Sequence, residues 1–405
     1  LKEYRANVIY MLYNEDIDSE SANIALATEN PDEVNTLLSV INNRGYNYKV
    51  VYRGSDTEEV ERIIGLKLVE KFFLRLRKLV SDRDVKQLMA IVDSSRKLYS
   101  ELVNFYSEVG NHPEKGDVFS NVLAFASTSI VRLGKNFKAK QLTPLQFNTT
   151  RILTFCLPTG GNIFVFQHDD EFTMFDAGYG LYYEDFKSLL VSKRINPSRV
   201  KRIFVSHADA DHIGCAGYFS EEFGAQVFIH PDCKGVMDKE NRGYGANTQL
   251  SRLNKHFTML VNRFTQCKYP KNMNFFPTEP LSKIGVFNII HTFRVGSLKF
   301  EVLESQGGHV PGQVFFLNRE HGLIFTSDYL INVESLSDEE REYLKLPRYL
   351  MTSTNTNSQL FREESKHLIE VIFSLNKKLK EKKSSVIIFP GHGNYYSYQE
   401  QFSIC

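Results

Sequence analysis

The feature that most constrains this chain is a run of two histidines and two aspartates within the six residues from His207 to His212. An apolar stretch, residues 203–205, precedes the run, and Gly214 follows it. A strand that ends before His207 would place all four polar side chains in the turn that follows. Neither packing nor solubility requires so many imidazoles and carboxylates together, whereas a metal ion does. The run therefore predicts a metal site at the end of a strand.

Length and composition indicate a globular protein. The chain has 405 residues, which exceeds the usual size of a single core and favours two domains. Its hydrophobic content is 42% and its charged content is 24%, as in ordinary globular proteins. A formal net charge of +1 gives no overall field that would attract nucleic acid or an anionic membrane. We therefore expect a small-molecule substrate, with neither a nucleic-acid partner nor a membrane partner.

Cysteine usage bears on the compartment. The five cysteines are an odd number and include no C-x-x-C pair. This pattern argues against a disulfide framework and favours a reducing, cytoplasmic setting. We expect buried free thiols.

The pattern of residues changes between about 135 and 150, which predicts an N-terminal domain over residues 1–140 and a second domain over residues 141–405. The first domain is expected to be mixed and mainly helical. The ranges predicted in it are strands at 6–13 and 46–53, a helix from Pro31 to about Gly45, and helices at 56–80, 85–109 and 118–133. It carries no catalytic cluster, and we interpret it as a structural or dimerising module that would form a homodimer. A partner-binding domain or a wall of the active site are the alternatives.

The second domain alternates short apolar runs with turns and helical stretches, which predicts a layered α/β architecture. The predicted strands are residues 151–155, 163–167, 172–175, 202–205, 226–229, 299–303, 314–317, 323–325 and 386–389.

Each further candidate ligand follows one of these predicted strands. Asp176 comes directly after residues 172–175, and His309, Asp328 and His392 follow later strands. Loops at one edge of a sheet can converge, and glycines beside these residues allow close backbone approach. The five sites therefore share one local pattern.

With these motifs in order, the second domain resembles the metallo-β-lactamase-fold hydrolases over about residues 150–400. The matching stretches are Phe-Asp-Ala-Gly at Asp176, Ser-His-Ala-Asp-Ala-Asp-His-Ile-Gly at His207, Gly-His-Val-Pro-Gly at His309, Thr-Ser-Asp at Asp328 and Pro-Gly-His-Gly at His392. The resemblance implies an αβ/βα four-layer sandwich with a dinuclear metal site at one edge. It implies nothing about residues 1–140.

The resemblance also implies roles for the ligands. One metal would be held by His207, Asp209 and His309. The other would be held by Asp211, His212 and His392. Asp328 would bridge the two ions, and Asp176 would orient the ligand loop through hydrogen bonds.

Asp209 departs from the family pattern, because most members have histidine there. A carboxylate adds a negative charge and a hard oxygen ligand, which shifts preference from zinc toward iron or manganese. The expected cofactors are therefore two divalent ions (iron, manganese or zinc), with iron or manganese favoured. The aspartate is also shorter than the glutamate of the flavodiiron branch, so the first metal site is expected to be weak or altered.

These features favour metal-dependent hydrolysis of an ester, thioester, lactone, amide or phosphoester, with a metal-bound hydroxide as nucleophile. Asp211 and Asp328 are the predicted catalytic residues. A diiron oxidoreductase or a protein that reacts with dioxygen or nitric oxide is the first alternative. A non-catalytic binding protein with a structural metal site is the second.

Residues 231–290 form a long connection between the second and third motifs. We interpret it as a cap-like insertion, with a helix over residues 247–264, that contributes substrate contacts. The candidates for such contacts are Arg242, Tyr244 and Arg252. A peripheral elaboration is the alternative.

Overall fold

The computed structural model describes residues 6–12, 22–28, 31–51, 53–54, 81–90, 128–246, 251–345 and 353–398. The chain divides into two compact units, Leu1–Gln87 and Leu88–Cys405. Each unit is described by itself. The domain boundary expected near residue 140 stays a prediction, because residues 91–127 lie outside the described part.

The described residues of the first unit form an antiparallel pair of strands, a helix after them, and the helical residues 82–87 at the end of the unit. Strand β1 (Ala6–Leu12) pairs with β2 (Asn23–Thr28), and helix α1 (Pro31–Asn43) follows. The predicted strand at 6–13 and the predicted helix from Pro31 are thereby confirmed, whereas β2 was not predicted.

The predicted strand at residues 46–53 is wrong. Residues 46–51 adopt no regular structure, and the side chains of Tyr46, Tyr48, Val50 and Val51 are exposed. Their alternating pattern resembles a strand, but no strand among the described residues pairs with them. The helix predicted at 56–80 lies outside the described residues. Of the helix predicted at 85–109, residues 85–90 are described and helical. Of the helix predicted at 118–133, residues 128–130 are helical and residues 131–133 form a turn.

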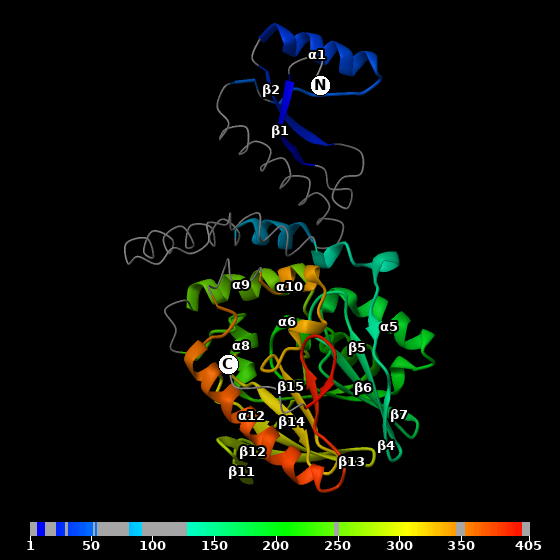
Figure 1. Cartoon of the computed structure of the whole chain (residues 1–405), viewed down its shortest axis with the longest axis vertical. Coiled ribbons are helices and arrows are strands. Elements are labelled where there is room, and N and C mark those ends of the chain that lie inside the picture. The colour runs from blue at the N-terminus through cyan, green and yellow to red at the C-terminus, as the bar shows by residue number, and fades with distance from the viewer. Residues whose placement is uncertain are drawn as a thin grey trace. The chain divides into compact units, whose positions relative to one another are not determined.

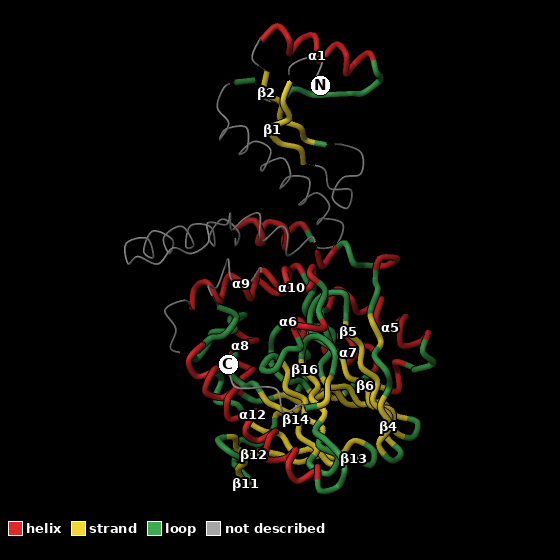
Figure 2. Tube along the Cα trace, viewed as in Figure 1, coloured by secondary structure: helices red, strands yellow, loops and turns green. Residues whose placement is uncertain are grey.

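The second unit consists of two β-sheets with helices on their outer faces (Figures 1 and 2). One sheet has the order β10-β9-β8-β7-β6-β5-β3, with β4 paired to β5, and the other runs β11-β12-β13-β14-β15-β16-β17. The fold is the predicted αβ/βα sandwich.

All nine strands predicted in this unit are present. Its strands are β3 (Lys140–Gln141), β4 (Leu145–Phe147), β5 (Thr150–Cys156), β6 (Ile163–His168), β7 (Glu171–Phe175), β8 (Val200–Phe204), β9 (Gln226–Ile229), β10 (Asn274–Phe275), β11 (Ser282–Ile284), β12 (Phe287–Val295), β13 (Leu298–Glu304), β14 (Val314–Asn318), β15 (Leu323–Ser327), β16 (Ile387–Pro390) and β17 (Tyr396–Ser397).

The helices of this unit are α5 (Tyr183–Ser192), α6 (Ala210–Ile213), α7 (Ala216–Phe223), α8 (Asp232–Lys239), α9 (Ser251–Phe264), α10 (Asp338–Lys345) and α12 (Ser358–Lys380), with 3₁₀ turns η2 (Gly134–Asn136), η3 (Gly180–Tyr182), η4 (Pro197–Arg199) and η5 (Val333–Ser335). The part of the predicted 247–264 helix that the structure describes is α9. Among the described residues, no helix combines the length and apolar composition needed to cross a membrane.

A phenylalanine-rich core joins the two sheets. Phe175 of β7 lies 4.6 Å from Phe316 of β14, and Phe164 of β6 lies 5.0 Å from Phe325 of β15, both measured between ring centroids. All four side chains are buried. Because these strands are covered on both faces, they read in the sequence as short, nearly continuous apolar runs.

Separate apolar clusters cover the outer faces. Phe186 of α5 packs edge-on against Phe155 of the first sheet, with ring centroids 5.6 Å apart. On the second sheet, Leu368 and Ile372 of α12 pack among buried residues of β12, β14 and β15. Figure 1 shows α5 and α12 on opposite sides of the strands. The two sheets are thus held as the middle layers, and their strand ends meet at one edge.

Candidate metal centre

Seven histidine and aspartate side chains converge where strands of both sheets end. They come from the segments that follow β8, β13, β15 and β16, and two of them, Asp211 and His212, lie in the short helix α6. Three overlapping groups of potential ligand atoms, each within 4.8 Å of one another, comprise His207, Asp209 and His309; His207, His212 and Asp328; and Asp211, His212 and His392. The structure therefore brings together all seven residues predicted as ligands, although their roles in binding metal stay predictions.

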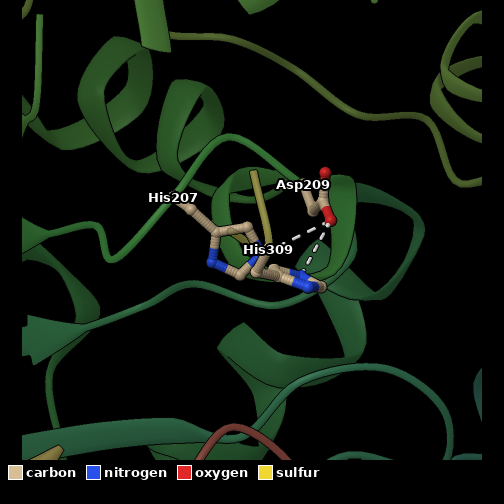
Figure 3. Close-up of side chains that lie close together, drawn as sticks. All are labelled: His207, Asp209 and His309. Atoms are coloured by element: carbon tan, nitrogen blue, oxygen red, sulfur yellow. Dashed lines mark ion pairs between the residues drawn. The ribbon is translucent and has the colours of Figure 1, made fainter. Parts of the chain in front are cut away.

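The first half-site comprises His207, Asp209 and His309. Asp209 Oδ2 lies 3.5 Å from His207 Nε2 and 3.6 Å from His309 Nε2. Figure 3 shows the carboxylate facing both imidazoles. Two ring nitrogens and one carboxylate oxygen thus surround a common point.

The second half-site comprises Asp211, His212 and His392. Asp211 Oδ2 lies 3.6 Å from His212 Nε2 and 3.4 Å from His392 Nε2. Asp328 stands between the two half-sites. Its Oδ1 lies 3.1 Å from His212 Nε2, and its Oδ2 lies 3.4 Å from His309 Nε2. Asp328 therefore occupies the position that a bridging carboxylate requires.

Unpaired polar atoms show that these residues fit metal ions. Among the described residues, His207 Nε2, His212 Nε2 and Asp328 Oδ1 are buried without any hydrogen-bond partner. A buried polar atom without a partner costs about 1–3 kcal/mol, so several at one point require an explanation. A divalent cation satisfies lone pairs on nitrogen and oxygen at the same time.

Hydrogen bonds at Nδ1 of His212 and His309 turn Nε2 of these rings toward the centre. Asp176 Oδ2 lies 2.8 Å from His212 Nδ1, and Asn355 Oδ1 lies 2.8 Å from His309 Nδ1. Such partners select the tautomer that leaves Nε2 free to bind a metal. Asp176 also accepts hydrogen bonds from the backbone N–H and the hydroxyl of Ser206. This is the position that the predicted orienting role requires, although the role stays a prediction.

Charges in the centre shift the pKa values of its members. Burial opposes protonation of His212, but the carboxylates around it raise its pKa well above the usual value. Burial likewise opposes protonation of His309, yet its aspartate neighbours raise its pKa to about 9. Burial disfavours ionisation of Asp328, and the surrounding histidines nevertheless hold its pKa well below the ordinary range. Asp328 is therefore ionised, as a carboxylate ligand of a cation must be.

Arg242 forms a two-pronged ion pair with Asp209. Its Nε donates to Asp209 Oδ1 at 3.1 Å, and its Nη2 donates to Oδ2 at 2.6 Å. Burial opposes ionisation of Asp209, but this guanidinium, together with the neighbouring His207 and His309, holds its pKa well below the usual value. These bonds place Arg242 beside a candidate ligand. Arg242 also lines the cavity next to the centre, so the substrate contact expected from the sequence stays a prediction. The charge that Asp209 adds is balanced, so charge alone no longer favours iron or manganese.

A cavity of about 90 Å³ opens onto the centre. Its lining includes Asp209, Asp211, His309, Asp328 and His392, and α9 contributes Phe257, Thr258, Val261 and Asn262. The insertion therefore forms one wall of the cavity.

Of the two other expected substrate contacts, the structure describes the side chain of Tyr244, which falls outside this lining. Tyr244 is 45% exposed, its ring lies against Gly235, and it is absent from the cavity wall. The side chain of Arg252 lies outside the described residues, so its expected contact stays untested.

The sequence analysis missed a buried glutamate that supports the His309 loop. Glu364 of α12 accepts hydrogen bonds from the backbone N–H groups of Gln306 and Gly308 at 2.6 and 3.0 Å. It also accepts one from the Tyr329 hydroxyl at 2.6 Å. The sequence does contain an indication of this role, because Glu364 stands one helical turn before the buried Leu368. A charged residue in line with the apolar face of a helix requires a buried partner.

Two tyrosines in the cavity wall were also missed. The Tyr343 hydroxyl donates to the Tyr179 hydroxyl at 3.0 Å, and both side chains are buried. Burial raises the pKa of both phenols, to well above the usual value for Tyr179. They therefore keep their protons and remain neutral hydrogen-bonding groups beside the metal ligands.

A family model described as the metallo-beta-lactamase superfamily matches residues 157–392, more than half of the chain. The chain belongs to the metallo-β-lactamase superfamily. The matched range contains all seven candidate ligands and begins within the sandwich unit. The resemblance inferred from the motifs is thereby confirmed.

Individual relatives are distant. Ribonuclease J of Synechocystis is 26% identical over 132 residues, 27% of this chain and 21% of that protein, so the match spans about a fifth of this curated relative. Among solved structures, the B3 metallo-β-lactamase BLEG-1 is 20% identical, with a TM-score of 0.37, over 64% of this chain and 93% of that one. A peroxy diiron form of the chemotaxis sensor ODP is 13% identical, with a TM-score of 0.36, over 64% and 89%.

Proposed function

We propose that this member of the superfamily is a metal-dependent hydrolase with a dinuclear centre. The observation that carries the proposal is the convergence of His207, His212 and Asp328, whose potential ligand atoms lie within 4.8 Å of one another. Nε2 of both histidines and Oδ1 of Asp328 are buried without a hydrogen-bond partner, and Asp328 lines the cavity. Two divalent ions, when bound, would activate water and polarise a carbonyl or phosphoryl oxygen of the substrate. One ion would be held by His207, Asp209 and His309. The other would be held by Asp211, His212 and His392, and Asp328 would contribute to both sites.

Asp211 is proposed to manage the proton of the attacking water. Its carboxylate lines the cavity, and Oδ2 faces the histidines of the second half-site. Oδ1 would accept a proton from water and return it to the leaving group. General acid–base catalysis of this kind contributes about 10²–10⁴-fold to a rate.

The walls of the cavity favour a substrate of modest size with an apolar portion. Phe257, Val261 and Leu344 contribute apolar surface to its lining. Apolar walls exclude water, which strengthens electrostatic interactions with the reacting atoms. The tyrosine pair, Tyr343 and Tyr179, provides hydroxyl groups that can orient a polar substrate group.

The test is turnover by the metal-loaded protein on a panel of ester, thioester, lactone, amide and phosphodiester substrates. A short RNA belongs in the panel because of the similarity to ribonuclease J. His207→Ala and Asp328→Ala should each abolish the activity, while His367→Ala, which changes a half-exposed histidine on α12, should retain it. Equal turnover by the wild type and both centre variants would refute the proposal.

A diiron oxidoreductase is the second candidate, and the three carboxylates among the seven candidate ligands favour it, because hard oxygen donors suit iron. Elemental analysis of protein purified without chelator discriminates between the two. Two irons per chain, with absorbance that changes on reduction, would support the redox function. Bound zinc, with no reactivity toward dioxygen or nitric oxide, would exclude the redox function. If the protein contains its metal ions but turns over no substrate, a structural role of the centre is favoured.

A further inference from the structure

The guanidinium of Arg242 lies against the first half-site. Its Nη2 is 2.6 Å from Asp209 Oδ2, the carboxylate oxygen that faces His207 and His309. The same Nη2 lies 3.4 Å from His309 Nε2. One nitrogen of the arginine therefore contacts two of the three ligand atoms of this half-site.

The insertion holds Arg242 in that position. Its backbone N–H donates to the Thr258 hydroxyl of α9 at 3.0 Å, and its Nη1 donates to the Thr354 carbonyl at 2.6 Å. The side chain is 3% exposed. A fully engaged, buried guanidinium is not a flexible surface charge, because moving it would break several charge-assisted hydrogen bonds.

The two half-sites consequently carry different charges. In the first, Arg242 cancels the single negative charge of Asp209, so the set is electrically equivalent to neutral imidazoles. In the second, Asp211 supplies one negative charge without such a partner, and Asp328, which stands between the half-sites, adds its charge to both. Among the described residues, no arginine or lysine forms an ion pair with either of those two aspartates. Divalent cations therefore experience a much stronger attraction in the second half-site.

We propose that Arg242 makes the two metal positions unequal, so that a divalent ion fills the second half-site first and the first half-site only weakly. An ion held by Asp209 Oδ2 and His309 Nε2 would have the guanidinium as a neighbour, because Nη2 contacts both of these atoms. Arginine keeps its charge at all ordinary pH values, so it repels such an ion. This inference concerns metal binding and does not depend on the hydrolytic reaction.

The test is a calorimetric titration with Mn²⁺, without substrate, of metal-free wild type and of metal-free Arg242→Gln and Arg242→Lys. Changing groups that contact metal ligands typically alters affinity by about 10- to 100-fold. We expect two binding events in the wild type, with dissociation constants at least about tenfold apart. Arg242→Gln should tighten the weaker event by about tenfold and leave the stronger one unchanged. Arg242→Lys, which retains the charge, should keep the weaker event weak.

Arg263→Gln is the matched control. Arg263 forms a similar two-pronged pair with Glu240 in the same insertion, with N–O distances of 2.9 and 3.1 Å, but touches no candidate ligand. Its titration should equal that of the wild type. Equal constants for both events in the wild type, or a weaker event that Arg242→Gln leaves unchanged, would overturn the proposal.

A second measurement does not depend on the folding of any variant. Crystals of the wild type with one equivalent of Mn²⁺ should give one anomalous peak, in contact with Asp211, His212 and His392. A peak at His207, Asp209 and His309, or peaks of equal height in both half-sites, would contradict the proposal.

Discussion

Asp176 Oδ2 lies 2.8 Å from His212 Nδ1, and this contact fixes which nitrogen of the ring faces the metal centre. Asp176 has φ of 55°, a left-handed conformation that asparagine also tolerates. Substitution to asparagine therefore changes the hydrogen bonding with little change in the backbone.

We expect Asp176→Asn to weaken metal binding by about 10- to 100-fold, because the amide no longer selects the tautomer that His212 needs. Metal titration measures the effect. Asp170→Asn, at an exposed carboxylate that pairs with Arg199, should bind metal as the wild type does. Unchanged affinity in Asp176→Asn would show that the contact does not orient a ligand.

Glu364→Gln should destabilise the protein by about 1–3 kcal/mol, because one of its two backbone donors loses its acceptor in a buried site. Urea unfolding measures this loss. Glu363→Gln changes the neighbouring exposed carboxylate of α12 and should leave the free energy of unfolding nearly unchanged. Equal stability of the two variants would show that Glu364 does not support the His309 loop.

Gly391→Ala should impair metal binding through a steric effect. A Cβ atom at this position would contact Asp328 Oδ1 at 2.3 Å and His212 Cε1 at 3.1 Å. The bridging carboxylate would have to move, so we expect metal affinity to fall by about tenfold or more. Gly224→Ala is a useful contrast, because it meets no neighbour but has a left-handed φ of 71°. It should lower stability and leave metal binding intact.

His168 should make stability depend on pH. Burial, together with Arg202, lowers the pKa of His168, so the unfolded chain binds the proton more readily than the folded one. Stability therefore falls as pH drops through about 6.5, the ordinary histidine value. In urea unfolding at pH 7.5 and 5.5, His168→Gln should lose less stability on acidification than the wild type. His367→Gln changes a half-exposed histidine and should lose as much stability on acidification as the wild type. An equal loss in His168→Gln would contradict the prediction.

Much of the sandwich unit was predictable because its strands are short and nearly all apolar. A run such as residues 314–317 is buried on both faces, so composition alone reveals it. The centre was predictable because each ligand follows a strand and stands near a glycine. The strand at residues 46–53 shows the limit, since an alternating pattern says nothing about whether a partner strand is available.

The contacts that modify the centre were not predictable. Arg242 is 33 residues from Asp209 in the chain, and no local pattern indicates that their side chains meet. The sequence consequently suggested that Asp209 adds an uncompensated charge. Glu364 gave a signal on its helix, but its partners in the His309 loop are more than 50 residues away. Long-range pairing of this kind follows from the fold and not from residue spacing.

The most direct test of the account is anomalous scattering from crystals grown with an excess of Mn²⁺. We predict two peaks inside the cavity. One should contact His207, Asp209 and His309, the other should contact Asp211, His212 and His392, and Asp328 should contact both. Crystals in which the cavity contains no anomalous peak, or in which other residues hold the manganese, would contradict the account.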